Sequence, residues 1–126
     1  MFEPEETSLD QLAKIKVIGV GGGGSNAVNR MISLGLEGVE FIAVNTDAQA
    51  LLASQAPRRI RIGEKSFPKI LDEIYDELIG ANLVFIVAGM GGKTATSAVP
   101  FIAACARSLD ATVISAVSSP FSFEDP

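Results

Sequence analysis

Four consecutive glycines at positions 21 to 24 follow an apolar, β-branched run and precede an amphipathic pattern. The run at residues 15–20 predicts a strand, and the apolar spacing predicts a helix from Ala27 onward. Glycine allows positive φ and close approach of a ligand, and a helix N-terminus offers free N–H groups and the positive end of its dipole. A plain turn needs fewer glycines. The segment therefore predicts a turn that binds phosphate groups.

A second glycine-rich turn is predicted at residues 89–97, between a strand at 83–88 and a helix at 98–109. Its triplet at 92–94, Gly-Lys-Thr, occurs in Walker A loops, but Val87 stands where such a loop requires its leading glycine. This mismatch excludes a P-loop. Two glycine-rich turns on neighbouring strands would hold one polyphosphate from both sides.

The rest of the chain alternates strands and helices. Further strands are predicted at residues 39–44, 58–62 and 111–117, and further helices at 48–54 and 71–79. The alternation predicts an α/β fold, a three-layer Rossmann-like parallel sheet of about five strands in the order 3-2-1-4-5 with helices on both faces. In that order both glycine-rich turns leave the sheet at the switch point, where ligands bind.

Polar residues end the second strand and charges line two other elements. Asn45 and Asp47 lie at the predicted ligand-binding edge, although Asp47 would equally cap the next helix. Three arginines between 58 and 61 fit protection of an edge strand better than a binding patch. The carboxylates between 72 and 77 form the solvated face of a helix, with no catalytic role.

Composition narrows the function further. The 126 residues are 48% hydrophobic, which predicts one domain, preceded by an acidic N-terminal arm at residues 1–13. A net charge of −5 argues against nucleic acid as a partner. There is no histidine and only one cysteine, so no catalytic residue and no metal site are identified from the residues alone. No signal or membrane-spanning segment is found, and a cytoplasmic location without membrane insertion is expected.

Residues 15–26, 39–52, 88–92 and 120–124 closely resemble the nucleotide-binding domain of the tubulin/FtsZ family of GTPases, which includes bacterial cell-division proteins. The resemblance covers nearly the whole chain and implies binding of GTP or GDP, with Mg²⁺, if present, arriving with the nucleotide. It implies that the first glycine turn wraps the phosphates, that Asn45 and Asp47 lie near phosphate and ribose or metal, and that residues 91–97 match the family's signature loop. The expected nucleotide-binding residues are Gly21, Gly22, Gly23, Gly24, Ser25, Asn26, Asn45, Asp47, Gly91, Gly92, Lys93, Thr94, Ala95, Thr96 and Ser97.

The chain departs from the family pattern in several places. Lys93, Ala95 and Ser97 replace glycines of the signature loop. The family's loop to the terminal phosphate is missing between Glu64 and Pro68, as are its central helix and second domain. By this resemblance residues 14–126 form a nucleotide-binding domain with little or no independent hydrolysis, and whether the chain is a GTPase stays uncertain.

Two alternatives remain open. A degenerate site would suit a regulatory or structural paralogue that binds FtsZ-like filaments or associates with itself. The spacing of Gly19, Gly21 and Gly24, with Asp47 at about the right distance, also fits an NAD-type dinucleotide-binding domain, although such a domain has one phosphate loop. For the preferred reading, a bulky residue at Gly23 is expected to abolish nucleotide binding while the fold survives.

Overall fold

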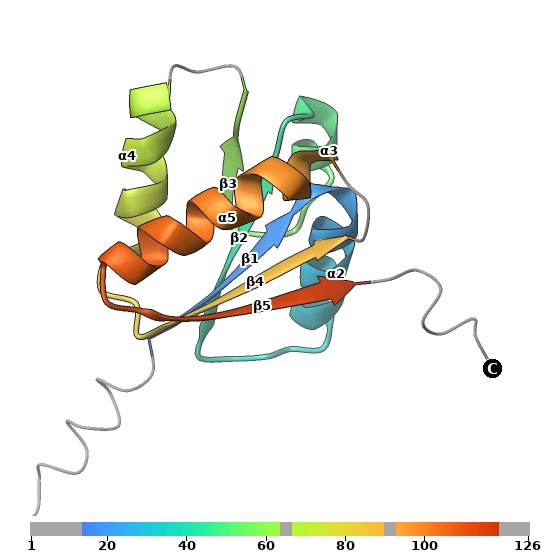
Figure 1. Cartoon of the computed structure of the whole chain (residues 1–126). Helices are drawn as coiled ribbons and strands as arrows, with labels where there is room; N and C mark the ends of the chain where they lie inside the picture. The colour runs from blue at the N-terminus through green and yellow to red at the C-terminus, as the bar shows by residue number, and fades with distance from the viewer. Residues whose placement is uncertain (1–13, 64–66, 90–92, 119–126) are drawn as a thin grey trace, which may run out of the picture.

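Five parallel strands form the centre of the molecule in the order β3-β2-β1-β4-β5 (Figure 1). The computed structural model describes residues 14–63, 67–89 and 93–118. The strands are β1 (Ile15–Val20), β2 (Val39–Asn45), β3 (Arg58–Arg61), β4 (Leu83–Gly89) and β5 (Thr112–Ser118). Their number, order and direction confirm the fold predicted from the sequence. The predicted N-terminal arm lies outside the described residues.

Helices cover both faces of the sheet, as predicted. They are α2 (Gly21–Ser33), α3 (Ala48–Leu52), α4 (Phe67–Leu78) and α5 (Lys93–Ser108). The apolar residues of α4 and α5 pack with one face of the strands, and those of α2 and α3 with the other. The chain thus forms three layers, helix, sheet and helix (Figure 1).

The central strand β1 supplies both halves of the core because it is covered on both sides. Ile18 and Val20 belong to the cluster under α4 and α5, whereas Val17 belongs to the cluster under α2 and α3. Ile18 is 1% exposed and Val20 is fully buried. A strand that is apolar on both faces is what a central parallel strand requires.

Helix boundaries differ from the sequence prediction mostly at the N-terminal ends. The helix predicted at 71–79 begins earlier, at Phe67, and α2 and α5 also start early. The C-terminal ends agree better, since α4 and α5 each end one residue before the predicted end. After α2, Gly35 has φ +78° and donates its N–H to the Ile32 carbonyl. Pro100 lies inside α5, on its exposed side.

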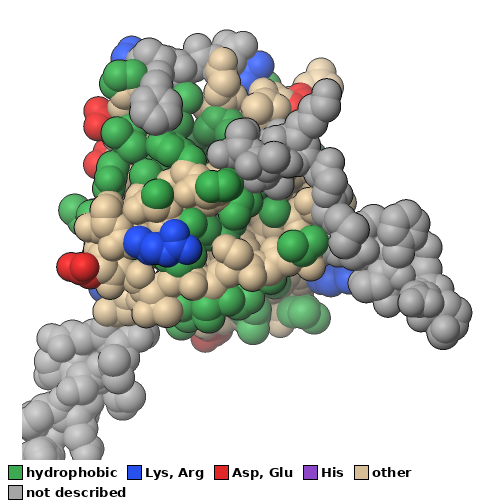
Figure 2. All heavy atoms as spheres, in the orientation of Figure 1, with side chains coloured by type: hydrophobic (Ala, Val, Ile, Leu, Met, Phe, Trp, Pro, Cys, Tyr) green, Lys and Arg blue, Asp and Glu red, His purple; other side chains and the backbone are tan. Residues whose placement is uncertain are grey.

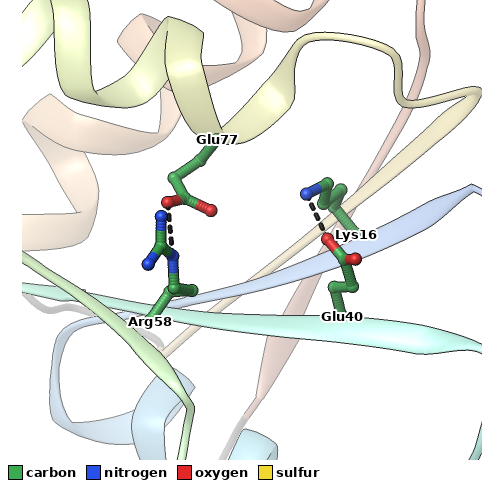
Figure 3. Close-up of polar contacts among 4 residues, drawn as sticks. All are labelled: Lys16, Glu40, Arg58 and Glu77. Carbon is green, nitrogen blue, oxygen red and sulfur yellow. Dashed lines mark hydrogen bonds and ion pairs between the residues drawn. The ribbon is translucent and has the colours of Figure 1, made fainter.

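Two ion pairs join elements that are far apart in sequence (Figure 3). Lys16 and Glu40 lie side by side on β1 and β2 and pair directly, which lowers the pKa of the Glu40 carboxyl. Arg58 on β3 donates to Glu77 on α4 over 2.7 Å. The pair therefore ties the edge strand to the helix beside it.

The other two β3 arginines bond to backbone carbonyls. Arg59 donates to the carbonyls of Ala56 and Leu51, and Arg61 donates to that of Thr46. These bonds fasten the chain around α3 to the edge strand, a structural role that sequence reasoning did not separate from edge protection.

In the described parts of the chain no helix is long and apolar enough to cross a membrane.

Candidate functional site

The carboxyl ends of β1, β2 and β4 meet at one edge of the sheet, and α2 and α5 begin there (Figure 1). β1 lies between the other two strands, so Val20 has Val44 on one side and Ala88 on the other. Helices that start at neighbouring strand ends direct their free N–H groups and positive dipole ends toward the same region. The strands β1 and β4, from which the two glycine-rich turns leave, are neighbours at the switch point, as the predicted strand order requires.

Helix α2 begins at Gly21, six residues before the predicted start at Ala27. A single residue makes the turn, because Gly21 has φ +74° while the next three glycines are already helical. The N-cap, Val20, offers no side-chain hydrogen bond, and no acidic residue lies in the first turn. The first N–H groups of α2 therefore meet no capping side chain from Val20 and no carboxylate from their own turn.

Close packing explains two of the helical glycines. A Cβ at Gly23 would lie 2.7 Å from the Cα of Gly89, and a Cβ at Gly24 would lie 2.4 Å from the carbonyl oxygen of Val87. Both distances are too short for non-bonded atoms. Glycine is needed here because α2 lies directly against β4, and the first turn of α2 touches the end of β4.

This packing corrects the expectation for Gly23. A bulky residue there would collide with backbone, so the fold would not survive unchanged. Gly22 is different: a Cβ built on it meets nothing within 4 Å, and the residue is exposed. Gly22 therefore faces open space at the start of α2. A larger side chain at this position would not disturb the packing of the helix, and it would obstruct a ligand bound there.

Ser25 lies one turn into α2 and is only 6% exposed. Its hydroxyl is buried and has no hydrogen-bond partner within the described part of the chain. A buried hydroxyl without a partner costs about 1–3 kcal/mol. A bound oxyanion near the start of α2 fits this residue, because it would supply an acceptor for the hydroxyl. The next residue, Asn26, is exposed.

The polar end of β2 is organised by its own side chains. Asn45 is 5% exposed, and its Oδ1 accepts from the backbone N–H groups of Thr46 at 2.7 Å and Asp47 at 3.1 Å. Asp47 accepts from Gln49 N–H at 2.9 Å and so caps α3. The capping role weighed in the sequence is present. These bonds hold the β2 turn in place beside α2.

The second glycine-rich turn is described only in part. Gly91 and Gly92 lie outside the described residues, and α5 begins at Lys93, five residues before the predicted start at Ala98. The backbone of Lys93, Thr94, Ala95, Thr96 and Ser97 forms the first turns of this helix, and their side chains lie outside the described part of the structure. No acidic residue occurs in the first turn of α5. The arrangement therefore pairs two helix N-termini at neighbouring strands.

Other surface features lie elsewhere. A groove between β3 and α4 contains Arg58, Glu73 and Asp76 among its lining residues, away from the glycine-rich turns. Among the described residues, no group of three or more Asp, Glu or Cys side chains is placed to hold a metal ion.

Sequence reasoning missed the contact between Gly23 and Gly89 and the burial of Ser25, because neither leaves a local pattern in the sequence.

Comparisons with known proteins agree with this geometry. The sequence profile of the Tubulin/FtsZ family, GTPase domain, matches residues 14–70 and 59–126. An FtsZ mutant from M. jannaschii is 33% identical, with a TM-score of 0.77 over 97% of this chain. An FtsZ dimer from the same organism gives the same identity and TM-score over 98%. TubZ of Clostridium botulinum phage c-st, truncated at its C-terminal tail, is 20% identical over 79% of the chain with a TM-score of 0.65, which shows a shared fold.

The chain spans less than half the length of these relatives, 43% of the FtsZ mutant and 38% of TubZ. The profile nevertheless covers all of residues 14–126, and the strand order agrees with the fold shared with the FtsZ structures. The chain belongs to the Tubulin/FtsZ family as a form of its GTPase domain.

Proposed function

We propose that this chain binds a guanine nucleotide, GTP or GDP, with its phosphates at the N-termini of α2 and α5. The observation that carries the proposal is the contact between Gly23 and Gly89, which brings the first turn of α2 against the end of β4. Two helix N-termini converge where a phosphate chain needs donors and positive charge. Guanine in particular comes from the family and not from a described residue.

The residues of the first turn have separate roles in this proposal. The N–H groups of Gly22, Gly23 and Gly24 donate to phosphate oxygens, and the buried Ser25 hydroxyl donates to the same group. The backbone N–H groups at the start of α5 serve the second side of the phosphate chain. The proposed site retains Asn26, Asn45, Asp47, Gly91 and Gly92, of which Asn45 and Asp47 hold the β2 turn through the bonds described above.

Magnesium, when bound, would neutralise phosphate charge, and its ligands would come largely from the nucleotide and water. Asp47 is the described carboxylate at this edge of the sheet, and it already accepts one hydrogen bond from α3. We propose that this chain has little or no independent GTP hydrolysis. A role in bacterial cell division and a cytoplasmic location are further parts of the proposal, and they rest on the family alone.

Calorimetric titration of the nucleotide-free chain with GDP and GTP, with and without Mg²⁺, tests the proposal. ATP and NAD are the competitors. Dissociation constants at or below about 1 μM, or about −8.2 kcal/mol, for GDP with weaker binding of ATP would support it. Absence of binding would favour a degenerate site, and preference for NAD would favour a dinucleotide domain. Release of inorganic phosphate from GTP measures hydrolysis separately.

A matched pair of variants locates the site. Gly22→Val adds bulk in open space at the start of α2 and should weaken GDP binding about tenfold or more while thermal stability is kept. Ser33→Val, at the exposed far end of the same helix, is the control and should bind as the unmodified chain does. Equal GDP affinity of the two variants would show that the start of α2 does not contact the nucleotide.

A further inference from the structure

The last arginine of β3 lies in the row of residues that ends the sheet beside the first glycine-rich turn. The strand register places Arg61 next to Asn45, and Val44 next to Val20. Since Asn45 follows Val44 and Gly21 follows Val20, the residues Arg61, Asn45 and Gly21 succeed one another across three neighbouring strands. The backbone of Arg61 is therefore two strand spacings, about 10 Å, from the start of α2.

The end of β3 contacts the polar end of β2 in several ways. The Nε atom of Arg61 donates to the backbone carbonyl of Thr46 over 3.1 Å. The next residue, Ile62, donates its N–H to the Asn45 carbonyl over 2.9 Å. A Cβ built on Gly63 would lie 3.6 Å from Cγ2 of Thr46, so the chain that leaves β3 passes beside this side chain. Arg61 is thus part of a longer contact between the two segments.

The β2 turn, residues 45–47, is held both from within and from the neighbouring strand. From within, Oδ1 of Asn45 accepts from the N–H groups of Thr46 and Asp47. From β3, Arg61 reaches the Thr46 carbonyl in the middle of the turn. Hydrogen bonds from a charged donor are among the stronger ones in proteins. Loss of the guanidinium would therefore loosen the turn at its centre.

The arginines of β3 have different partners, which provides a matched comparison. Positive side chains lie singly on the face of the molecule that carries α5 (Figure 2), whereas β3 carries three arginines among its four residues. Arg58 pairs with Glu77 on α4. Arg59 donates to backbone carbonyls around the end of α3. Arg61 is directed to the β2 turn, so the same substitution at Arg58 and Arg61 affects different parts of the fold.

We propose that Arg61 is a positioning residue for nucleotide binding, which acts through the β2 turn and does not touch the phosphates. The inference rests on the proposed function. The turn carries Asp47, whose carboxylate is directed to α3 by its hydrogen bond to the Gln49 N–H. Because like charges repel, a turn that keeps this carboxylate on α3 favours a phosphate chain at the start of α2. If the turn adopts other arrangements, only the competent fraction of molecules binds, and the apparent dissociation constant rises in proportion.

Calorimetric titration of the full chain with GDP compares Arg61→Met with Arg58→Met. Both substitutions remove one positive charge and one side-chain hydrogen-bond donor from the same strand. Arg61→Met should raise the dissociation constant at least about fivefold, equivalent to about 1 kcal/mol, whereas Arg58→Met should stay within about twofold of the unmodified chain. Arg61→Lys keeps a positive donor and should recover part of the affinity.

The outcomes separate this inference from the proposed function. If the unmodified chain binds GDP and Arg61→Met binds it equally well, the inference is overturned and the proposed function stands. If the unmodified chain does not bind GDP, the proposed function fails and the inference falls with it. Equal losses of affinity in Arg61→Met and Arg58→Met would show a general effect of charge or stability and would also overturn the positioning role.

Two further measurements distinguish positioning from direct contact with phosphate. In NMR spectra of the nucleotide-free chain, the backbone amide signals of Thr46 and Asp47 should shift in Arg61→Met and stay in place in Arg58→Met. The ratio of GDP affinities between the unmodified chain and Arg61→Met should change less than about twofold between about 0.1 M and about 1 M salt, since a positioning bond is not screened as a phosphate contact would be. Unshifted amide signals, or a ratio that falls toward one at high salt, would contradict the proposal.

Discussion

Alanine at two neighbouring positions of α2, Gly22 and Gly24, is expected to change stability in opposite directions. At Gly24 the new Cβ would lie 2.4 Å from the Val87 carbonyl oxygen and 2.9 Å from the carbonyl carbon of Gly19. Both neighbours are backbone atoms of central strands and cannot rotate away. At Gly22 the same atom meets nothing within 4 Å. The two variants therefore carry the same substitution in the first turns of the same helix, and they differ in the room available for the new Cβ.

The magnitudes follow from two opposing effects. Replacing glycine by alanine inside a helix stabilises by about 0.5–1 kcal/mol, because alanine loses less backbone entropy. Overpacking costs about 1–3 kcal/mol, and contacts with backbone place Gly24→Ala at the upper end. The net expectation is about 2 kcal/mol of destabilisation for Gly24→Ala and somewhat under 1 kcal/mol of stabilisation for Gly22→Ala.

Urea unfolding of the nucleotide-free variants measures both effects, with unchanged m-values confirming that the transition is comparable. Thermal unfolding gives an independent check, because a change of 1 kcal/mol in stability should shift the melting temperature by on the order of 4 °C. If Gly24→Ala unfolds within about 0.5 kcal/mol of the unmodified chain, α2 does not lie against β4 as described and the account of the glycine run fails.

Two further predictions concern charges. Glu40→Gln should lower stability at neutral pH by at most about 1 kcal/mol, because the pair with Lys16 is partly exposed. Lys16 lowers the pKa of Glu40 below its usual value of 4.5, so the ionised carboxylate stabilises the fold at pH values above 4.5. The difference in unfolding free energy between Glu40→Gln and the unmodified chain should therefore vanish as the pH falls through the folded-state pKa. Urea midpoints measured against pH test this, and a difference that persists at lower pH would contradict it. Lys93→Ala should weaken GDP binding severalfold, most strongly at low salt, since it removes a positive charge at the start of α5. Lys69→Ala, on the exposed surface of α4, is the calorimetric control, and tighter binding by Lys93→Ala would show that the lysine obstructs the site.

The sequence was sufficient for the strand order and the layers because the strands and helices have clear apolar periods. It was insufficient for the starts of α2 and α5. The glycines at 22–24 have low helix propensity and Lys93 to Ser97 show no apolar period, yet both segments are helical. Helix propensity describes single residues, so it cannot indicate that α2 needs glycine in order to lie close to β4.

Parts of the site were likewise hidden from a one-dimensional pattern. Asn45 was expected at the ligand edge, and the structure shows its Oδ1 engaged by two backbone N–H groups. The burial of Ser25 depends on how α2 lies on the sheet, and the contact between Gly23 and Gly89 depends on how close α2 lies to β4. Such features arise from long-range contacts, so local spacing cannot specify them.

Pro100 interrupts the hydrogen bonding of α5 in the middle of the helix. Proline has no N–H, so the helical hydrogen bond that would join this position to the turn before it is missing. Ala98 before it, and Ile102, Ala103 and Ala106 after it, anchor the helix in the core. Pro100 is exposed, so water can donate to the carbonyl that is left without a helical donor. The interruption therefore falls between residues that are buried on either side of it, so the helix stays fixed to the sheet across the missing hydrogen bond.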